Sequence, residues 1–173
     1  MTGPVLVVVG PPAAGKTTVG TAVAAALGVG FRDTDADVEA ATGTTVADLF
    51  VQHGEPHFRE LEAAAVARAL AEHDGVLALG GGAVLSPATR ELLVASGCTV
   101  VWLDVDVASA AHRVGLSRDR PLLAVNPRAM LRTMLEARAP LYAEVSTVTV
   151  PTAGRPVPDV VADVLAAAGQ VAP

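Results

Sequence analysis

The sequence predicts an α/β fold with a mainly parallel sheet, and three observations lead to it. Short apolar runs alternate with longer segments that suit helices, as in parallel strands joined by crossover helices. The runs are almost continuously hydrophobic, which strands buried on both faces require. The first run leads directly into Gly10–Thr17, which fits the pattern G-x-x-x-x-G-K-[ST] of a phosphate-binding P-loop. Because the chain has 173 residues, we expect one domain over residues 1–173.

Five segments are expected to be strands, because apolar residues follow one another in short runs. They are Val5–Val9, Val29–Asp33, Val76–Leu79, Thr99–Asp104 and Thr147–Val150. Seven longer segments between and after them suit helices, and three of these have a proline in the first turn, where a missing N–H is harmless. They are Lys16–Leu27, Thr45–His53, Pro56–Glu72, Pro87–Ala95, Val107–Val114, Pro127–Arg138 and Val157–Ala168. The proline two residues after Arg138 is expected to end the sixth helix.

Composition and charge exclude several classes of function. A net charge of −6 provides no basic surface for nucleic acid. No apolar stretch reaches the ~20 residues that span a bilayer, and no basic region precedes the first apolar run, so we expect neither a membrane anchor nor a signal peptide. A single cysteine, Cys98, excludes an intrachain disulfide and suits a reducing compartment. We therefore expect a small cytoplasmic enzyme.

Lys16 is the only lysine in the chain, against eleven arginines. In a P-loop the lysine reaches the β- and γ-phosphates, and a compact ammonium fits there where a planar guanidinium would need a different loop. The hydroxyl of Thr17, which follows, is placed to bind Mg²⁺ beside the phosphates. These two residues predict a nucleotide site with a magnesium ion.

Two carboxylates, Asp33 and Asp35, follow the second expected strand. Ligands of an open parallel sheet bind beyond the carboxyl ends of its strands, so both residues are expected to face the same crevice as the P-loop. One could serve the metal and the other a substrate hydroxyl. The alternative is that these acids only cap the next helix.

Further along the chain, three features are candidates for parts of a binding site. Arg59 and Glu62 lie three residues apart, a spacing that ordinarily gives a solvent-exposed helical ion pair. Gly80–Gly82 follows an expected buried strand, where missing Cβ atoms allow backbone N–H groups to approach a ligand. The non-periodic segment Gly115–Asn126 is usually a surface loop, but in a phosphotransferase it would be a natural mobile lid.

Taken together, these features resemble the shikimate kinase family. The resemblance covers about Val5 to Arg155 and rests on six segments in the family's order. They are the P-loop, Asp33-Thr34-Asp35, Gly54-Glu55 with Phe58-Arg59 and Glu62, Leu79-Gly80-Gly81-Gly82, Arg120-Pro121-Leu122-Leu123, and Arg138-Ala139-Pro140-Leu141-Tyr142. The resemblance implies ATP- and Mg²⁺-dependent phosphorylation of the 3-hydroxyl of shikimate, a step of aromatic amino-acid synthesis. It also implies a P-loop fold like that of nucleoside monophosphate kinases, with a five-stranded parallel sheet of order 2-3-1-4-5.

The resemblance also implies a role for each matched residue. It implies a helical substrate-binding region at about 34–62 and a lid at about 113–126. The implied catalytic residues are Lys16, Asp35 and Arg120, and the implied metal site is Thr17 and Asp33. The implied nucleotide site is Gly10, Ala13, Ala14, Gly15, Lys16, Thr17, Thr18, Arg113, Arg120 and Arg155. The implied shikimate site is Asp35, Arg59, Glu62, Gly80, Gly81, Gly82 and Arg138. Asp35 could take the 3-hydroxyl proton, and Arg59 and Arg138 would grip the carboxylate.

The P-loop departs from the usual pattern of the family, and two rival functions remain. The family usually has another glycine inside the P-loop, where this chain has Ala13-Ala14, and an alanine at positive φ would cost energy. A gluconate kinase of the same fold would also bind a carboxylate. A non-catalytic nucleotide-binding regulator is the rival from another class, although every expected catalytic residue type is present. We expect a monomer with a small-molecule substrate and no nucleic-acid or membrane partner.

Overall fold

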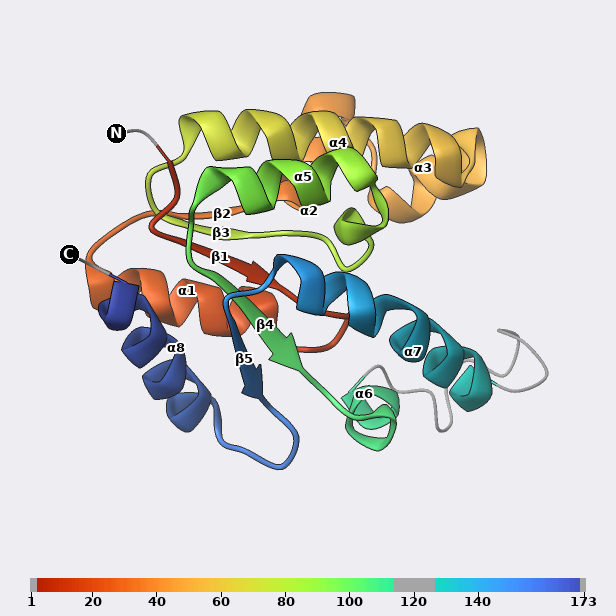
Figure 1. Cartoon of the computed structure of the whole chain (residues 1–173). Helices are drawn as coiled ribbons and strands as arrows, with labels where there is room; N and C mark the ends of the chain where they lie inside the picture. The colour runs from red at the N-terminus through yellow and green to blue at the C-terminus, as the bar shows by residue number, and fades with distance from the viewer. Residues whose placement is uncertain (1–2, 114–126, 172–173) are drawn as a thin grey trace.

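The computed structural model describes residues 3–113 and 127–171, which form a parallel sheet between two layers of helices (Figure 1). The sheet has five strands in the order β2-β3-β1-β4-β5, and every strand pairing is parallel. The strands are β1 Leu6–Val9, β2 Phe31–Asp33, β3 Val76–Ala78, β4 Val100–Asp104 and β5 Val148–Pro151. The implied strand order is confirmed, and each strand lies within two residues of its predicted bounds.

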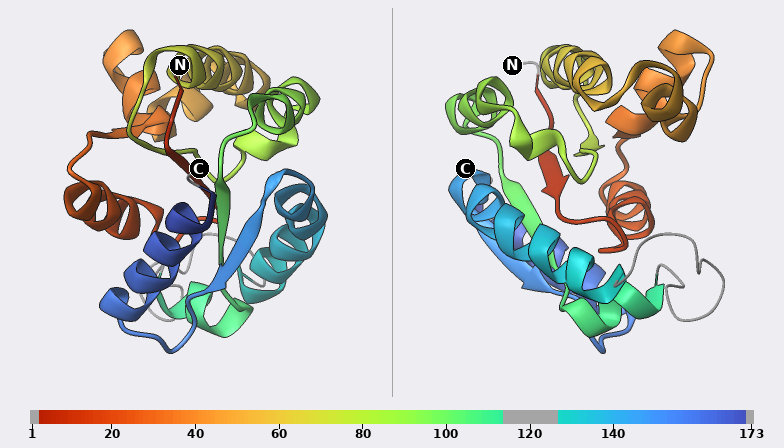
Figure 2. Two further views of the ribbon diagram at one scale, coloured as in Figure 1. Left: turned by 60° about the vertical axis from the view of Figure 1, so that its left-hand side comes forward. Right: turned by 90° about the vertical axis from the view of Figure 1, so that its right-hand side faces the viewer.

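The helices lie in two layers and one additional group (Figure 2). Helices α1 (Lys16–Leu27), α6 (Val107–Arg113) and α8 (Val157–Val171) contribute to one apolar cluster with the sheet. Helices α4 (Glu55–Glu72), α5 (Pro87–Ser96) and α7 (Pro127–Val145), with the short 3₁₀ helix η1 (Ala83–Leu85), contribute to the cluster on the other face. Helices α2 (Thr34–Thr42) and α3 (Val46–His53) pack against α4.

Strand β1 is the centre of the core because its side chains alternate between the two faces. Leu6 and Val8 belong to the cluster of α1 and α8, whereas Val7 and Val9 belong to the cluster of α4, α5 and α7. All four are at most 1% exposed, which confirms the two-sided burial that the continuous apolar run predicts. A third cluster of Val38, Leu49, Phe58 and Ala65 joins α2, α3 and α4 apart from the sheet.

Local pattern missed one helix and the end of another, and tertiary contacts explain both. Helix α2 is not among the seven segments that local pattern predicts, because in Thr34–Thr42 only Val38 is a large apolar residue, although α2 lies in the helical region that the resemblance implies. Asp33 caps α2 and Val38 is buried. Helix α7 continues past Pro140 to Val145 although the proline was expected to end it. The last turn after Pro140 places Tyr142 and Val145 in the core, and this burial outweighs the missing N–H.

In the part of the chain that the structure describes, no helix combines the length and the hydrophobicity needed to span a bilayer.

Candidate active site

The P-loop lies between the buried strand β1 and the first turn of α1. The Lys16 ammonium donates hydrogen bonds to the carbonyls of Gly10 and Pro11, each at 2.9 Å. Gly15 caps α1 in the left-handed conformation, with φ of 89°, and the free N–H groups of the first helical turn follow it. A helix N-terminus of this kind attracts phosphate through its N–H groups and its dipole.

Ala13 is strained in this loop. It has a φ of 68°, and it is the one non-glycine residue with positive φ among residues 3–113 and 127–171. The predicted cost of alanine at this point of the P-loop is therefore present in the structure. The Ala13 carbonyl accepts a hydrogen bond from Arg113 at 3.0 Å, which helps to hold the strained turn.

We expect Ala13→Gly to stabilise the free protein by about 0.5–1 kcal/mol. Relief of the left-handed strain is worth about 1–2 kcal/mol, and the greater freedom of glycine in the unfolded chain offsets about 0.4–1 kcal/mol of it. Denaturant unfolding measures the difference. Ala14→Gly is the matched control, because Ala14 is 1% exposed and is not among the positive-φ residues, so that change should destabilise. Equal effects of the two changes on the free energy of unfolding would mean that Ala13 is not strained.

Burial lowers the pKa of Lys16 to about 8, while the nearby carboxylates of Asp35 and Asp33 oppose this shift. The Lys16 amino group is therefore only partly protonated in the free protein at pH 8. Anionic phosphates would favour the charged form and raise this pKa when they bind.

We expect nucleotide binding at pH 8 to take up about half a proton, because a group with a pKa of about 8 is half protonated there. Calorimetric titration in two buffers of different ionisation enthalpy measures this uptake. The uptake should fall at pH 6, where Lys16 is already charged, and vanish in Lys16→Met. Equal uptake by the variant and the wild type would assign the proton to another group.

Thr17 and Asp33, the two predicted metal residues, lie together at the start of α1 and the end of β2. The Thr17 hydroxyl donates to Asp33 Oδ2 at 3.2 Å, while Asp33 Oδ1 accepts from the Asp35 N–H at 2.9 Å. The sequence left open whether Asp33 faces the P-loop or only caps the next helix. In the structure Asp33 caps α2 and also faces the P-loop.

The chemistry of these donors fits Mg²⁺. Both are oxygen ligands, which hard cations prefer. Over the described ranges there is no group of three or more His, Cys, Asp or Glu residues able to hold a metal ion by itself. Mg²⁺ is usually held by one or two protein oxygens, several waters and substrate phosphates, and two oxygen donors such as Thr17 and Asp33 fit that mode of binding.

Asp35 lies in the first turn of α2 against Gly80. A Cβ atom on Gly80 would lie 2.5 Å from an Asp35 oxygen and 2.7 Å from a Glu62 oxygen, so only glycine lets both carboxylates approach. Burial and the neighbouring Asp33 charge raise the pKa of Asp35. A carboxylate with a raised pKa is a better proton acceptor than one in water.

Gly81 and Gly82 give the same freedom to two other neighbours. A Cβ atom on Gly81 would lie 2.8 Å from the ring of Pro12 in the P-loop, and one on Gly82 would collide with the guanidinium of Arg59. The Tyr142 hydroxyl donates to the Gly81 carbonyl at 2.6 Å and fixes this turn from α7. The triplet thus brings the P-loop, α4 and α7 together.

Arg59 is held by two carboxylates and two rings. Its Nη1 donates to Glu62 Oε1 at 2.8 Å, and its Nε and Nη2 each lie 3.2 Å from Glu55 Oε1. The Phe58 and Phe50 ring centroids lie 5.3 and 5.8 Å from its central carbon. Glu62 is 2% exposed, so this pair is not the solvent-exposed helical pair that its spacing ordinarily gives. Desolvation raises the pKa of Glu62, although Arg59 opposes this.

Arg138 extends the cationic side of the site from α7. It is half-buried, and its positive charge lowers the pKa values of Lys16, Glu62 and Tyr142. Burial raises the pKa of Tyr142 to about 12, so the Tyr142 hydroxyl keeps its proton and remains a donor.

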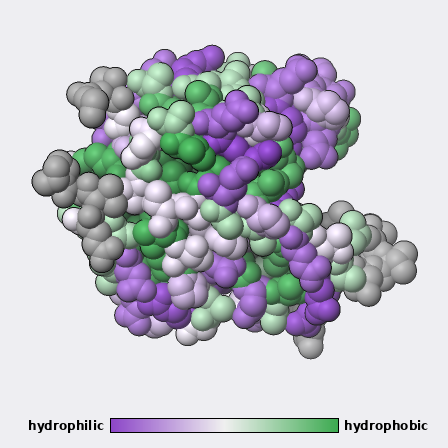
Figure 3. All heavy atoms as spheres, viewed as in Figure 1, coloured by the Kyte–Doolittle hydropathy of each residue, from purple (hydrophilic) through white to green (hydrophobic). Residues whose placement is uncertain are grey.

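Two adjoining cavities meet at the P-loop. The first, of about 260 Å³, is lined by Lys16, Thr17, Asp33 and Asp35 among others. The second, of about 170 Å³, is lined in part by Arg113, Thr152, Arg155 and Val157. Ala13, Gly15 and Thr18 line both, so a ligand with phosphates at the loop could extend into either cavity. Figure 3 shows the surface hollowed between the α3–α4 end and α7.

The two arginines of the second cavity have protein partners. Arg113 bonds to the Thr152 hydroxyl at 3.2 Å and carbonyl at 3.1 Å, and Arg155 pairs with Asp163 at 2.7 Å. These contacts hold both guanidinium groups at the wall of this cavity. Of the predicted lid at about 113–126, the structure describes Arg113 alone, and Arg120 lies outside the described residues.

Sequence reasoning missed several supporting residues. The buried Thr34 accepts a hydrogen bond from the Gly80 N–H at 3.2 Å, and Thr152 orients Arg113. Thr34 lies within the Asp33-Thr34-Asp35 motif, but only its carboxylates were considered there. Threonines carry no sequence signal of such a role, because the partner is distant in the chain.

Known proteins resemble the chain over almost its whole length. A family model described as shikimate kinase matches residues 12–168. The chain is 63% identical to a shikimate kinase of Frankia casuarinae, over 94% of this chain and 71% of that protein. The structure of a shikimate kinase from Acinetobacter baumannii in complex with shikimate superposes with a TM-score of 0.86 at 36% identity, over 95% of this chain and 92% of that one. A gluconokinase from Sinorhizobium meliloti superposes less well, with a TM-score of 0.61 at 26% identity, over 96% and 92%.

Proposed function

The chain belongs to the shikimate kinase family, and we propose that it transfers the γ-phosphoryl group of ATP to the 3-hydroxyl of shikimate. The observation that carries the proposal is the convergence of Asp35 and Arg59 on the glycine triplet next to the P-loop. A hydroxyl near Asp35 and a carboxylate near Arg59 suit a hydroxylated carboxylic acid such as shikimate. The weaker superposition of the gluconokinase disfavours the gluconate alternative.

The nucleotide would lie across the P-loop, with its phosphates at the α1 N-terminus and its base in the cavity of Arg113 and Arg155. Lys16 would exchange its two carbonyl partners for phosphate oxygens. Thr17 and Asp33 would hold Mg²⁺, which when bound neutralises charge on the transferring phosphate.

Shikimate would lie between Asp35 and the arginines. Arg59, fixed by Glu62, and Arg138 would bind its carboxylate with their planar guanidinium groups. Asp35 would orient the 3-hydroxyl and accept its proton as the oxygen attacks the γ-phosphorus, while the bond to the ADP oxygen breaks. Positioning and charge neutralisation are the main sources of catalysis in this reaction class. A monomeric state and a cytoplasmic location stay predictions from the sequence.

ADP release coupled to a spectrophotometric signal tests the proposal with shikimate, gluconate, nucleoside monophosphates and no acceptor. We expect turnover that depends on shikimate, with the other acceptors poor or inert. Strong turnover of gluconate without turnover of shikimate would refute it. Nucleotide binding without turnover of any acceptor would instead favour the regulator.

We expect Arg59→Lys and Arg138→Lys each to raise the KM for shikimate by about 10–100-fold, because a charge-assisted hydrogen bond is worth about 1.5–3 kcal/mol. Steady-state kinetics with each substrate varied measures the change. The KM for ATP should move less. Arg68→Lys is the matched control, because Arg68 is exposed on the same helix as Arg59. Equal losses for both substrates would mean that the changes disturb the structure.

A further inference from the structure

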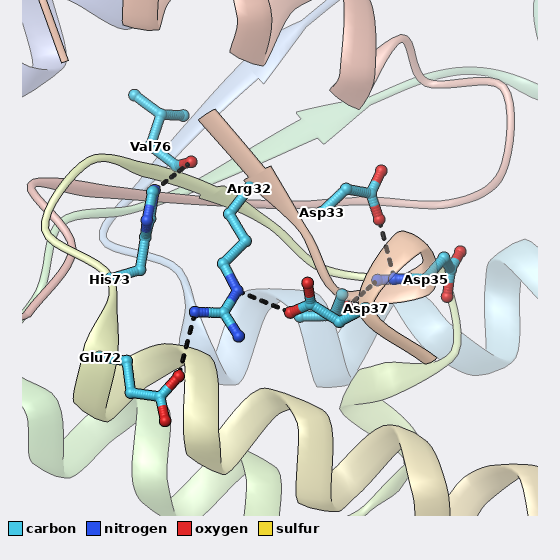
Figure 4. A network of polar contacts seen from close by, with 9 residues as sticks. Arg32, Asp33, Asp35, Asp37, Glu72, His73 and Val76 are labelled. Carbon is cyan, nitrogen blue, oxygen red and sulfur yellow. Dashed lines mark hydrogen bonds and ion pairs between the residues drawn. The ribbon is translucent and has the colours of Figure 1, made fainter. Parts of the chain in front are cut away.

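Arg32 connects three elements beneath the site (Figure 4). It lies on the edge strand β2, directly before Asp33. Its Nε donates to Asp37 Oδ2 on α2 at 2.7 Å, and its Nη1 donates to Glu72 Oε2 at the end of α4 at 3.3 Å. Arg32 and Asp37 are about one-quarter exposed, at 24% and 26%, whereas Glu72 is 56% exposed. The pair with Asp37 is thus the shorter and better shielded of the two.

Helix α2 needs such a contact because its apolar packing does not attach it to the sheet. Val38 packs with α3 and α4 in the third cluster, separate from the two clusters that cover the sheet. The first turn of α2 is instead attached by polar contacts. On the side of the site, Thr34 accepts from the Gly80 N–H. On the other side, Asp37 binds Arg32.

Asp35 and Asp37 are two residues apart on α2, so their side chains point about 200° apart around the helix axis. Figure 4 shows the Asp35 carboxylate directed away from the Arg32–Asp37 pair. Asp35 faces Gly80, and Asp37 faces Arg32 on β2. A rotation of this turn would therefore break the Arg32–Asp37 pair and move Asp35 from the glycine triplet.

We propose that Arg32 and Asp37 are a positioning pair that sets the direction of Asp35 by fixing the first turn of α2. The inference rests on the proposed function of Asp35 as the residue that orients the substrate hydroxyl. The pair acts through geometry. The pKa of Asp35 is shifted by burial and by the charges of Asp33, Lys16, Glu39 and Arg59, and neither Arg32 nor Asp37 is among these causes.

The test compares Arg32→Met, Asp37→Ala and the double variant with the wild type. A misplacement of about 1 Å can reduce turnover by up to about 10²-fold, and we expect each single change to lower kcat about 10-fold. The double variant should lose no more than either single variant, because both remove one contact. The KM for ATP and the pH dependence of kcat should stay those of the wild type. Arg32→Lys should recover part of kcat.

Glu72→Ala is the matched control, because it removes the other carboxylate partner of Arg32 but leaves α2 attached. It should retain wild-type kcat. Wild-type kcat in both Arg32→Met and Asp37→Ala would overturn the inference, as would an equal loss of ATP affinity. Failure of the wild type to phosphorylate shikimate would refute the proposed function instead.

Amide hydrogen exchange of residues 34–42 tests the same pair without substrate. We expect faster exchange in Arg32→Met and Asp37→Ala, and wild-type exchange in Glu72→Ala. Unchanged exchange in the first two variants would overturn the positioning role, whatever acceptor the enzyme uses.

Discussion

Replacement of Asp35 by asparagine is expected to lower kcat by about 10²–10⁴-fold, the usual contribution of a general base. The amide keeps the size of the side chain but cannot accept the hydroxyl proton. The thermal midpoint at pH 7 should equal or exceed that of the wild type. Folding raises the pKa of Asp35, so the ionised carboxylate destabilises the folded state above that pKa, and the change removes this penalty.

Steady-state kinetics and a thermal scan of the same preparation measure the two effects. Asp48→Asn is the control, because Asp48 is an exposed carboxylate in the first turn of α3. It should leave kcat unchanged. A wild-type kcat in Asp35→Asn would mean that another residue, or the phosphate itself, accepts the proton.

Lys16→Met is expected to lower kcat by about 10²–10³-fold, the usual loss when one preorganised donor to a developing negative charge is removed. It should also weaken ATP binding, because the phosphates lose the ammonium that the loop encloses. Coupled assays at saturating shikimate, with the ATP concentration varied, separate the loss of kcat from the loss of ATP affinity.

Lys16→Arg keeps the charge and tests the shape of the site. The ammonium fits between the Gly10 and Pro11 carbonyls, and a planar guanidinium does not match that position. We therefore expect Lys16→Arg to lose nearly as much as Lys16→Met. Recovery to wild-type kcat would mean that charge alone is needed. Lys16 is the only lysine, so an amine-reactive reagent at pH 8 has one side-chain target, which ATP should protect.

Local pattern was sufficient for most of the secondary structure. The five strands appear where apolar residues run together, and the seven predicted helices begin within one residue of their predicted starts. Strand β1 shows why. Each of its residues enters the core on one face of the sheet or the other, so the apolar run predicts a strand without knowledge of the neighbouring strands. The P-loop motif is equally local, because its loop and helix start are consecutive in the chain.

Local pattern failed where distant residues decide the structure. Helix α2 has a weak apolar face, and its first turn depends on Asp33, Arg32 and the Gly80 N–H. Helix α7 passes Pro140 because Tyr142 binds the Gly81 carbonyl and fills the core. Propensity acts over a few residues, whereas these contacts join positions up to 61 residues apart.

The sequence by itself determined the strands, the phosphate loop and the types of side chain available for chemistry. Only the tertiary structure decided that Asp35, Glu62 and Arg59 meet at the glycine triplet, and that Glu62 is buried. The physical reason is the strand order: β3 lies between β2 and β1, so the turn after β3 lies between the carboxylates that follow β2 and the P-loop that follows β1. At that turn the absence of Cβ atoms at Gly80 and Gly82 lets side chains of α2 and α4 approach, and the absence of one at Gly81 lets Pro12 of the P-loop approach.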